Sequence, residues 1–357
     1  MPLKCDSPNQ WFHGEGILQW GPRPPGIRIR PNMNQPRKLL VVGGGTMGVD
    51  IAAAFMAGGW EATVVEPITI GHDQRQAHLQ ASLRSIGAQP RPARFVAGLA
   101  DADPQHGDYG LVIEAVPEQL ELKRKVFAEL DRLVPAEVPV CSNSSAIPIS
   151  AIAEGLASRS RMLGTHFFMP AHLVPGVEVV SSVETDPRVA HRVSVDLASA
   201  GRIPIMVKRD IPGFLVNRLQ HAISREALSL IDQGIATPEE VDKAVRFGFG
   251  FRYLAAGPCL QRDHAGLDVH LAAARSIYPD LDRSAVPSTI LRQRVEEGAL
   301  GMKAGRGFFE WSEASISAER ARYQRLLIAA AALLEQEILA EQARQASSSP
   351  GIEKSIA

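Results

Sequence analysis

The sequence predicts an α/β fold, in which a domain built on a parallel sheet is followed by a smaller all-α domain. From residue 38 to about residue 207, short apolar runs rich in β-branched residues alternate with helical patterns, which is the rhythm of βαβ units. After Pro212-Gly213 the pattern is only helical. The chain of 357 residues is long enough for two domains, since a domain usually takes roughly 100–200 residues.

The individual elements follow in chain order. Seven short apolar runs predict strands at 39–42, 62–65, 111–113, 138–141, 162–166, 177–180 and 203–207. Longer stretches with helical spacing predict a helix from Thr46 and helices over 72–86, 214–233 and 316–345. Another helix should begin at Thr237-Pro238-Glu239-Glu240, because threonine is a good cap and proline suits the first helical turn.

Four regions are predicted along the chain. Residues 1–36 are rich in proline and have no periodic apolar pattern, so we expect a poorly ordered N-terminal extension. Residues 37–210 should form the sheet domain, and residues 211–311 the helical domain. Residues 312–357 are expected to form a C-terminal helix and a tail.

Composition narrows the possible functions. The 38 basic and 39 acidic side chains nearly cancel, which disfavours nucleic acid as the main partner. The sequence contains no stretch of about 18 uninterrupted apolar residues, so no membrane span is predicted. The three cysteines are spaced for neither a disulfide framework nor a zinc site, so we expect a cytoplasmic protein without a metal ion.

A glycine-rich turn, Gly43-Gly44-Gly45-Thr46-Met47-Gly48, follows the first strand and opens the first helix. In this context the G-x-G-x-x-G pattern is typical of a Rossmann-type dinucleotide site. Gly43 permits a tight turn, Gly45 lets the backbone approach a pyrophosphate, and Gly48 allows close packing of the helix. Glu66 ends the next strand, where a carboxylate accepts hydrogen bonds from the ribose and repels a 2′-phosphate. The motif therefore predicts NAD as the cofactor.

A second group of residues suggests acid–base chemistry. His166 ends one predicted strand and Glu178 lies early in the next, so the two side chains meet if the connection folds the chain back. Histidine titrates near neutral pH and can take the proton of a hydroxyl group while hydride leaves the same carbon. A carboxylate partner would fix its tautomer. Ser145 would supply a hydroxyl group to hold the substrate oxygen.

The segment from about Lys38 to Trp311 resembles the L-3-hydroxyacyl-CoA dehydrogenase family. The motifs that carry the resemblance agree in order and spacing: the Gly43 loop with its Thr-Met-Gly ending, EAVPE at 114–118, SNSS at 142–145, HFF at 166–168, VEVV at 177–180, DIPGFLVNR at 210–218 and KAGRGF at 303–308. The resemblance implies an NAD-dependent enzyme that interconverts L-3-hydroxyacyl-CoA and 3-ketoacyl-CoA in fatty acid metabolism.

The resemblance also implies roles for individual residues. His166 would be the general base, oriented by Glu178, and Ser145 and Asn217 would bind the reacting oxygens of the substrate. The expected cofactor-binding residues are Gly43, Gly45, Thr46, Met47, Gly48, Glu66, Glu118, Lys123, Ser145 and Lys303. A homodimer is implied too, and the run 222–235 offers an apolar face at helical spacing.

Two departures from the family pattern concern the substrate. Met169 follows the His-Phe-Phe triplet, where the family usually has asparagine. Coenzyme A users also insert a long basic helical pair after the cofactor acid, whereas residues 72–94 have room for one helix and a strand. Relatives that act on free hydroxy acids or ring alcohols share this shortened lobe. A dehydrogenase of a small compound without coenzyme A is therefore the main alternative.

An alternative of another class is an NAD-binding structural protein, as lens crystallins related to this family illustrate. Such a protein has no need to retain a catalytic constellation. Ser145, His166, Glu178 and Asn217 are all present, which favours an enzyme. Two arginines and one histidine offer a place for a substrate carboxylate, and a surface role explains them equally well: Arg252, Arg262 and His264.

Overall fold

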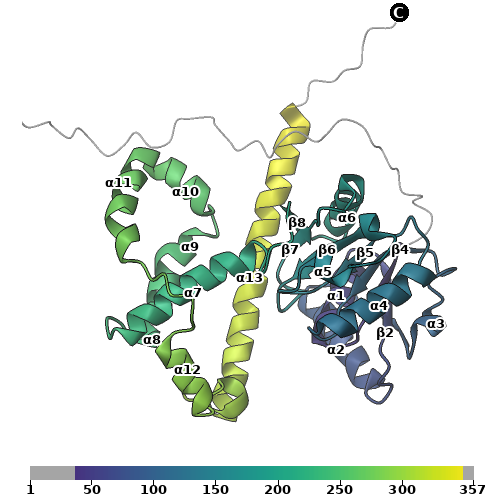
Figure 1. The fold of residues 1–357 in the computed structure, drawn as a ribbon, viewed down its shortest axis with the longest axis horizontal. Coiled ribbons are helices and arrows are strands. Elements are labelled where there is room, and N and C mark those ends of the chain that lie inside the picture. Colours follow the sequence, from purple (N-terminus) through teal and green to yellow (C-terminus); the bar gives the residue numbers. More distant parts are fainter. Residues whose placement is uncertain (1–36, 349–357) are drawn as a thin grey trace, which may run out of the picture. The chain divides into compact units, whose positions relative to one another are not determined.

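The computed structural model describes residues 37–348 (Figure 1), so the predicted disorder of residues 1–36 lies outside the described residues. Eight strands form one sheet in the order β3-β2-β1-β4-β5-β6-β7-β8. The strands are β1 (Lys38–Val42), β2 (Glu61–Val65), β3 (Arg94–Val96), β4 (Tyr109–Glu114), β5 (Val140–Ser142), β6 (Met162–Phe167), β7 (Gly176–Val180) and β8 (Ile203–Val207). The order of the first six strands is that of a dinucleotide-binding sheet.

Helices cover both faces of this sheet, and a separate apolar core lies under each group of helices. One core contains α1 (Thr46–Ala57), α2 (His72–Ser85) and α6 (Pro187–Ser199). The other contains α3 (Leu99–Ala102), α4 (Leu120–Leu133) and α5 (Ile149–Ile152). Strand β1 serves both cores, because successive side chains point to opposite faces: Leu39 and Val41 lie in the first core, and Leu40 and Val42 in the second.

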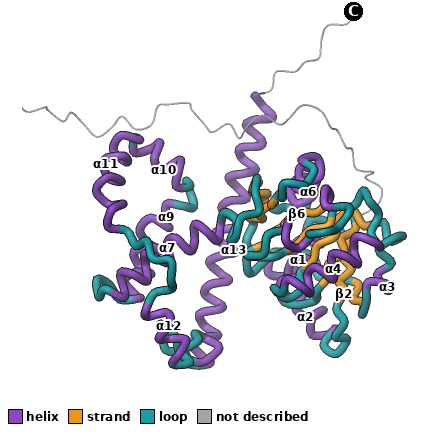
Figure 2. The backbone as a smooth tube through the Cα atoms, in the orientation of Figure 1, coloured by secondary structure: helices purple, strands orange, loops and turns teal. Residues whose placement is uncertain are grey.

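The chain after Phe214 is helical, as Figure 2 shows by colour. Its helices are α7 (Val216–Asp232), α8 (Pro238–Lys243), α9 (Gly250–Arg252), α10 (Pro258–Ala265), α11 (Leu267–Ile277), α12 (Thr289–Glu296) and α13 (Glu313–Ser348). The predicted helix start at Thr237 is confirmed, since its side chain accepts a hydrogen bond from the Glu240 backbone N–H. None of the helices in residues 37–348 is long and apolar enough to cross a bilayer.

The predicted fold class is confirmed, with two differences in the sheet. Room for a strand was expected after the helix in residues 72–94, but the sequence did not define its bounds, because β3 has only three residues and follows a segment with two prolines. Strand β7 runs antiparallel to β6, whereas a parallel sheet was expected. The connection 168–175 explains this reversal, since a parallel crossover needs a dozen or more residues.

Candidate active site

The glycine loop between β1 and α1 has the geometry that a dinucleotide requires. Gly43 has φ +112°, and a Cβ atom there would lie 2.7 Å from the Ala115 carbonyl oxygen. A Cβ atom at Gly48 would lie 1.9 Å from the Gly43 carbonyl oxygen, so the helix packs too closely for any side chain. A Cβ atom at Gly45 would meet nothing within 4 Å, which leaves open space at the N-terminus of α1. A pyrophosphate fits such a place, because free N–H groups and the helix dipole attract anions.

Glu66 lies at the end of β2, beside this loop. Its carboxylate accepts hydrogen bonds from the Gly44 N–H at 2.9 Å and from the Ile68 N–H at 3.0 Å, and 9 % of the residue is exposed. Arg75 lies next to it and donates to the Gly44 carbonyl oxygen. The position fits a carboxylate that accepts hydrogen bonds from the ribose hydroxyl groups of NAD.

The sheet register places His166 directly opposite Glu178 on the antiparallel pair β6–β7. Nδ1 of His166 lies 2.6 Å from Oε2 of Glu178, and both side chains are buried. Oε1 of the same carboxylate accepts hydrogen bonds from the backbone N–H groups of Leu215 and Val216, each at 2.8 Å. Burial raises the pKa of Glu178, but these hydrogen bonds outweigh it and hold the pKa below its ordinary value.

The imidazole of His166 has aromatic neighbours on two sides. The rings of Phe168 and Phe214 lie edge-on to it, with centroid distances of 4.7 and 5.6 Å. Phe214 was not predicted as a site residue, although it belongs to the quoted 210–218 motif. Since Glu178 accepts the Nδ1 proton, Nε2 is the nitrogen that remains for a substrate, and no described residue hydrogen-bonds to it. Met169, the residue after Phe168, is 66 % exposed.

Ser145 and Asn217 are brought together across the start of the helical region. Nδ2 of Asn217 donates a 3.0 Å hydrogen bond to the Ser145 carbonyl oxygen, and no described residue hydrogen-bonds to the exposed Ser145 hydroxyl group. The neighbouring Asn143 accepts a hydrogen bond from the Phe167 N–H, which ties this loop to the end of β6. Asn143 was not among the predicted site residues, although it stands in the quoted SNSS motif.

Glu118 and Lys123 hold the turn that carries Ser145. The Glu118 carboxylate accepts hydrogen bonds from the Ser144 hydroxyl group at 2.6 Å and from the Ser145 N–H at 3.0 Å. Lys123 is 1 % exposed, and its ammonium group lies 2.8 Å from Glu114 and 3.4 Å from Glu118. Burial raises the pKa of Glu114, and the Lys123 charge offsets only part of that effect. The ammonium group is thus surrounded by protein oxygens.

Lys303 stands apart from these residues. It lies exposed on a short 3₁₀ turn, Met302–Ala304, in the helical region. Among residues 37–348 it has no hydrogen-bond or ion-pair partner, and the structure does not bring it to the other predicted site residues. Its predicted contact with the cofactor remains a prediction.

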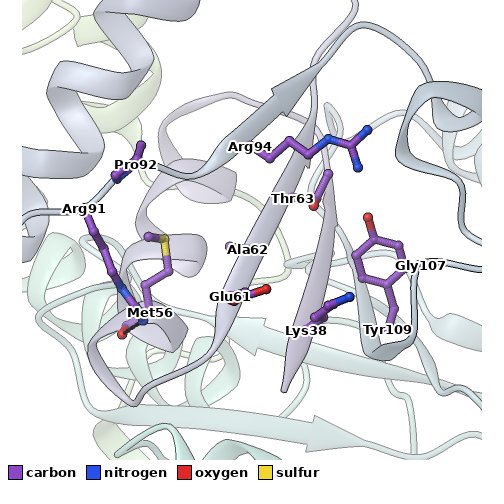
Figure 3. A pocket seen from close by; sticks show the side chains of 10 residues that line it. All are labelled: Lys38, Met56, Glu61, Ala62, Thr63, Arg91, Pro92, Arg94, Gly107 and Tyr109. Atoms are coloured by element: carbon purple, nitrogen blue, oxygen red, sulfur yellow. Dashed lines mark hydrogen bonds between the residues drawn. The ribbon is translucent and has the colours of Figure 1, made fainter. Parts of the chain in front are cut away.

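A separate pocket of about 410 Å³ lies at the amino ends of the strands, opposite the glycine loop (Figure 3). Lys38, Glu61 and Tyr109 line it at the starts of β1, β2 and β4, together with Arg91 and Arg94. The glycine loop and Glu66 follow the carboxyl ends of β1 and β2. Ligands of open α/β sheets bind at the carboxyl ends, so this pocket is not the cofactor site.

Comparisons with known proteins agree with this arrangement. Residues 38–211 match the model of the 3-hydroxyacyl-CoA dehydrogenase NAD-binding domain, and residues 213–311 match the C-terminal domain of the same family. The chain is 34% identical over 284 residues to a 3-hydroxybutyryl-CoA dehydrogenase of Mycobacterium tuberculosis, covering 77% of this chain and 98% of the relative. It is 32% identical over 279 residues to an L-carnitine dehydrogenase of Streptomyces griseus, covering 71% and 81%.

Another relative matches a larger share of the chain. The 5-formyl-3-hydroxy-2-methylpyridine 4-carboxylate 5-dehydrogenase of Mesorhizobium japonicum is 29% identical over 307 residues, which cover 84% of this chain and 98% of the relative. A crystal structure of a dehydrogenase for this pyridine compound, described as an NAD⁺-dependent dismutase, superimposes with a TM-score of 0.78 and covers 84% of this chain and 99% of that one. Because both family models match and together cover most of its length, the chain belongs to the 3-hydroxyacyl-CoA dehydrogenase family and is an NAD-dependent oxidoreductase.

Proposed function

We propose that this protein oxidises a hydroxyl group of a small substrate that does not carry coenzyme A. The shortened lobe, residues 72–94, contains four arginines that could meet the phosphates of coenzyme A: Arg75, Arg84, Arg91 and Arg94. The observation that carries the proposal is that three of them bond to the protein backbone. Arg75 donates to the Gly44 carbonyl oxygen, Arg91 to those of Met56 and Trp60, and Arg94 to that of Asp101. Each of these guanidinium groups is thus held by backbone carbonyl oxygens of the protein, and the lobe itself consists of α2 and the short β3.

The chemistry follows from the His166–Glu178 pair. NAD bound at the glycine loop supplies the acceptor for the hydride that leaves the substrate carbon. Since Nδ1–H of His166 donates to Glu178, Nε2 is free to take the hydroxyl proton, and the Glu178 charge stabilises the imidazolium that forms. Ser145 and Asn217, which hydrogen-bond to each other, would hold the reacting oxygen. The products are a carbonyl compound, NADH and one proton.

The walls of the reacting centre favour a compact apolar or ring substrate. Phe168 and Phe214 place apolar rings on two sides of His166, and the neighbouring Met169 offers an exposed apolar side chain. The Mesorhizobium relative is named for a substituted pyridine carboxylate, which is a compact ring compound. A hydrated formyl group carries the same H–C–O–H arrangement as an alcohol, so one base at His166 serves either group.

A second candidate is the interconversion of L-3-hydroxyacyl-CoA and 3-ketoacyl-CoA. The 34% identity to a mycobacterial 3-hydroxybutyryl-CoA dehydrogenase favours it. Among the four arginines of the lobe, Arg84 is exposed and hydrogen-bonds to no described residue, so one cation remains for a nucleotide phosphate. This function would place the protein in fatty acid metabolism.

We further infer that the protein is a homodimer paired through its helical region. Many large apolar side chains of that region are exposed, including Leu219, Phe247 and Leu267 at 52, 72 and 63 %. Of the side chains described after Phe214, only that of Ala299 is buried. A surface of this kind is typical of one that is covered by a partner.

The test is NADH formation by purified protein with two sets of substrates. One set contains L-3-hydroxybutyryl-CoA and longer thioesters, and the other contains carnitine, L-gulonate, 3-hydroxybutyrate and pyridine carboxylates that bear hydroxymethyl or formyl groups. We expect turnover only in the second set. Turnover confined to thioesters would reject the proposal in favour of the second candidate.

The matched control is His166→Gln. We expect this variant to lose roughly 10²- to 10⁴-fold in kcat, because it removes the acid–base group. Its NADH affinity should stay the same, since the glycine loop and Glu66 are untouched. Near-normal turnover would eliminate His166 as the base.

A further inference from the structure

A buried charged cluster beside the cofactor helix has no part in the chemistry described above. Asp50 of α1 is 1 % exposed, and a single carboxylate oxygen, Oδ1, receives all its close polar contacts. Nε2 of His78 lies 2.8 Å away, the Ser82 hydroxyl group donates at 2.9 Å, and Nδ1 of His172 lies 3.0 Å away. His78 and Ser82 are one turn apart on α2, whereas His172 comes from the connection 168–175.

The Asp50 carboxyl group of this cluster is held in its negatively charged form. Burial raises the pKa of Asp50, but the contacts with His172, His78 and Ser82 outweigh it and lower the pKa to about 2. Although two histidines and one carboxylate meet here, no group of residues within the described chain is arranged to hold a metal ion. The carboxylate therefore acts on its two imidazole neighbours directly.

His172 connects this charge to the reacting centre. It lies in the connection that starts directly after β6, where Phe168 packs edge-on against His166 at 4.7 Å. His172 is 8 % exposed, and its carbonyl oxygen accepts a hydrogen bond from Arg202. The connection is thus fixed at His172 from two sides, four residues beyond Phe168.

The contact between Asp50 and His172 is short but is not aligned as a hydrogen bond. Nδ1 of His172 is buried and has no aligned hydrogen-bond partner among the described residues, even though Oδ1 of Asp50 is only 3.0 Å away. Ser82, in contrast, donates a well-formed hydrogen bond to the same oxygen. A neutral side chain of the same size at position 50 would therefore lose its attraction for His172.

We propose that Asp50 is a positioning residue for the reacting centre, whose charge holds His172 and thereby fixes the connection that packs Phe168 against His166. The inference rests on His166 being the acid–base group of the proposed function. Asp50 also stands on the helix whose N-terminus faces the cofactor loop, so the same side chain joins the cofactor helix to the substrate side of the site.

The experiment compares Asp50→Asn, His172→Gln and the double variant with two controls. The controls are His78→Gln and Ser82→Ala, which remove contacts of Asp50 on α2 and leave His172 in place. Three quantities are measured: the NMR signal of His166 in protein labelled with [¹³Cε1]histidine, NADH affinity by fluorescence titration, and kcat with a substrate found in the panel. The His166 signal is assigned by its absence from His166→Gln.

We expect the His166 signal to shift in both Asp50→Asn and His172→Gln, and to stay in place in the two controls. The kcat value should fall about tenfold in each single variant, since small misplacements at a reacting centre are costly. The double variant should be no worse than either single variant, because the two residues act through one contact. NADH affinity should change less than about twofold, which a general loss of structure in α1 would not allow.

Several results would overturn the proposal: an unchanged His166 signal, equal effects in the controls, additive losses in the double variant, or NADH affinity falling as far as kcat. If Asp50→Asn does not fold, His172→Gln alone must show the signal shift with unchanged NADH affinity. If no substrate in the panel is turned over, the substrate proposal fails by itself, and the NMR and NADH measurements still decide the role of Asp50.

Discussion

Glu178 divides its two carboxylate oxygens between two parts of the molecule. Oε2 orients the His166 ring, and Oε1 accepts the backbone N–H groups at the start of α7. Both roles use the one negative charge of the carboxylate. Oε2 bonds to the ring, while Oε1 already accepts two backbone hydrogen bonds. One consequence is that the start of the helical region and the catalytic ring share a fixed point, which an uncharged residue at position 178 would remove.

At the cofactor end, we expect Glu66→Ala to weaken NAD binding and to relax discrimination against NADP. The carboxylate accepts hydrogen bonds from the Gly44 N–H of the glycine loop and from the Ile68 N–H after β2, and it would repel a 2′-phosphate. Arg75, which lies 3.7 Å from Glu66, would be left beside the open position and would favour a phosphate. The measurement is the ratio of kcat/KM for NAD and NADP.

The control for this variant is Glu61→Ala, at the exposed opposite end of the same strand. That change should leave the ratio as it is. An unchanged ratio in Glu66→Ala would show that another residue sets the cofactor preference.

Among the elements, helix α6 carries a buried acid that opposes folding at neutral pH. Burial raises the pKa of Asp196 to about 6, although Arg37 and Arg192 act in the opposite direction. An acid whose pKa is higher in the folded state binds more protons there, so stability should fall as pH rises from about 4 to 6. We expect Asp196→Asn to raise the free energy of unfolding at pH 8 by about 1–3 kcal/mol, an order-of-magnitude figure from the shift.

The measurement is urea unfolding at pH 4.5 and pH 8, and the gain should be clearly larger at the higher pH. Asp186 at the start of the same helix provides a control with the opposite sign. It caps α6 by accepting the Arg188 N–H, and that bonding lowers its pKa. Asp186→Ala should therefore destabilise the protein at both pH values, and the loss should shrink only below about pH 4, where the carboxyl group of the unfolded chain takes up a proton. A loss of stability at pH 8 in Asp196→Asn would contradict the prediction.

Most elements could be predicted from the sequence, because β-branched runs and helical spacing report local structure. The strands 203–207 and 177–180 were expected within one residue of their observed bounds. The bounds of strand β3 could not be predicted, because three residues give no detectable period. The antiparallel direction of β7 was not predicted from the apolar pattern. Strand direction depends on the path of the connection 168–175, and apolar residues do not determine that path.

Site residues divide in the same way. Motif order pointed to His166 and Glu178, and the ladder brings the two side chains together. The spacing of Lys123 from Glu118 gave no sign that the ammonium group is buried among carboxylates, since burial depends on how α4 packs. Asp50 and His172 are far apart in sequence and have no motif, so only the folded chain shows that they meet.

At the scale of the whole molecule, the exposed apolar surface of the helical region leads to a prediction about assembly. We expect light scattering to give twice the chain mass at micromolar concentration. Leu219→Asp together with Ile223→Asp, one turn apart on α7, should yield monomers, because a charge at a buried contact is costly. Gln220→Asp on the same helix is the matched control and should remain dimeric. A wild-type protein that is monomeric at this concentration would contradict the expectation.

The direct pairing of His166 with Glu178 across two antiparallel strands has a consequence for how this enzyme can change. The catalytic pair is set by the ladder between β6 and β7, whereas Phe168, which packs against His166, lies in the connection between those strands. Replacements within that connection can alter the surface offered to a substrate while the backbone register of the pair is kept, provided that His172 and its contact with Asp50 remain. New substrates are therefore most readily reached by changing positions of the connection other than Phe168 and His172.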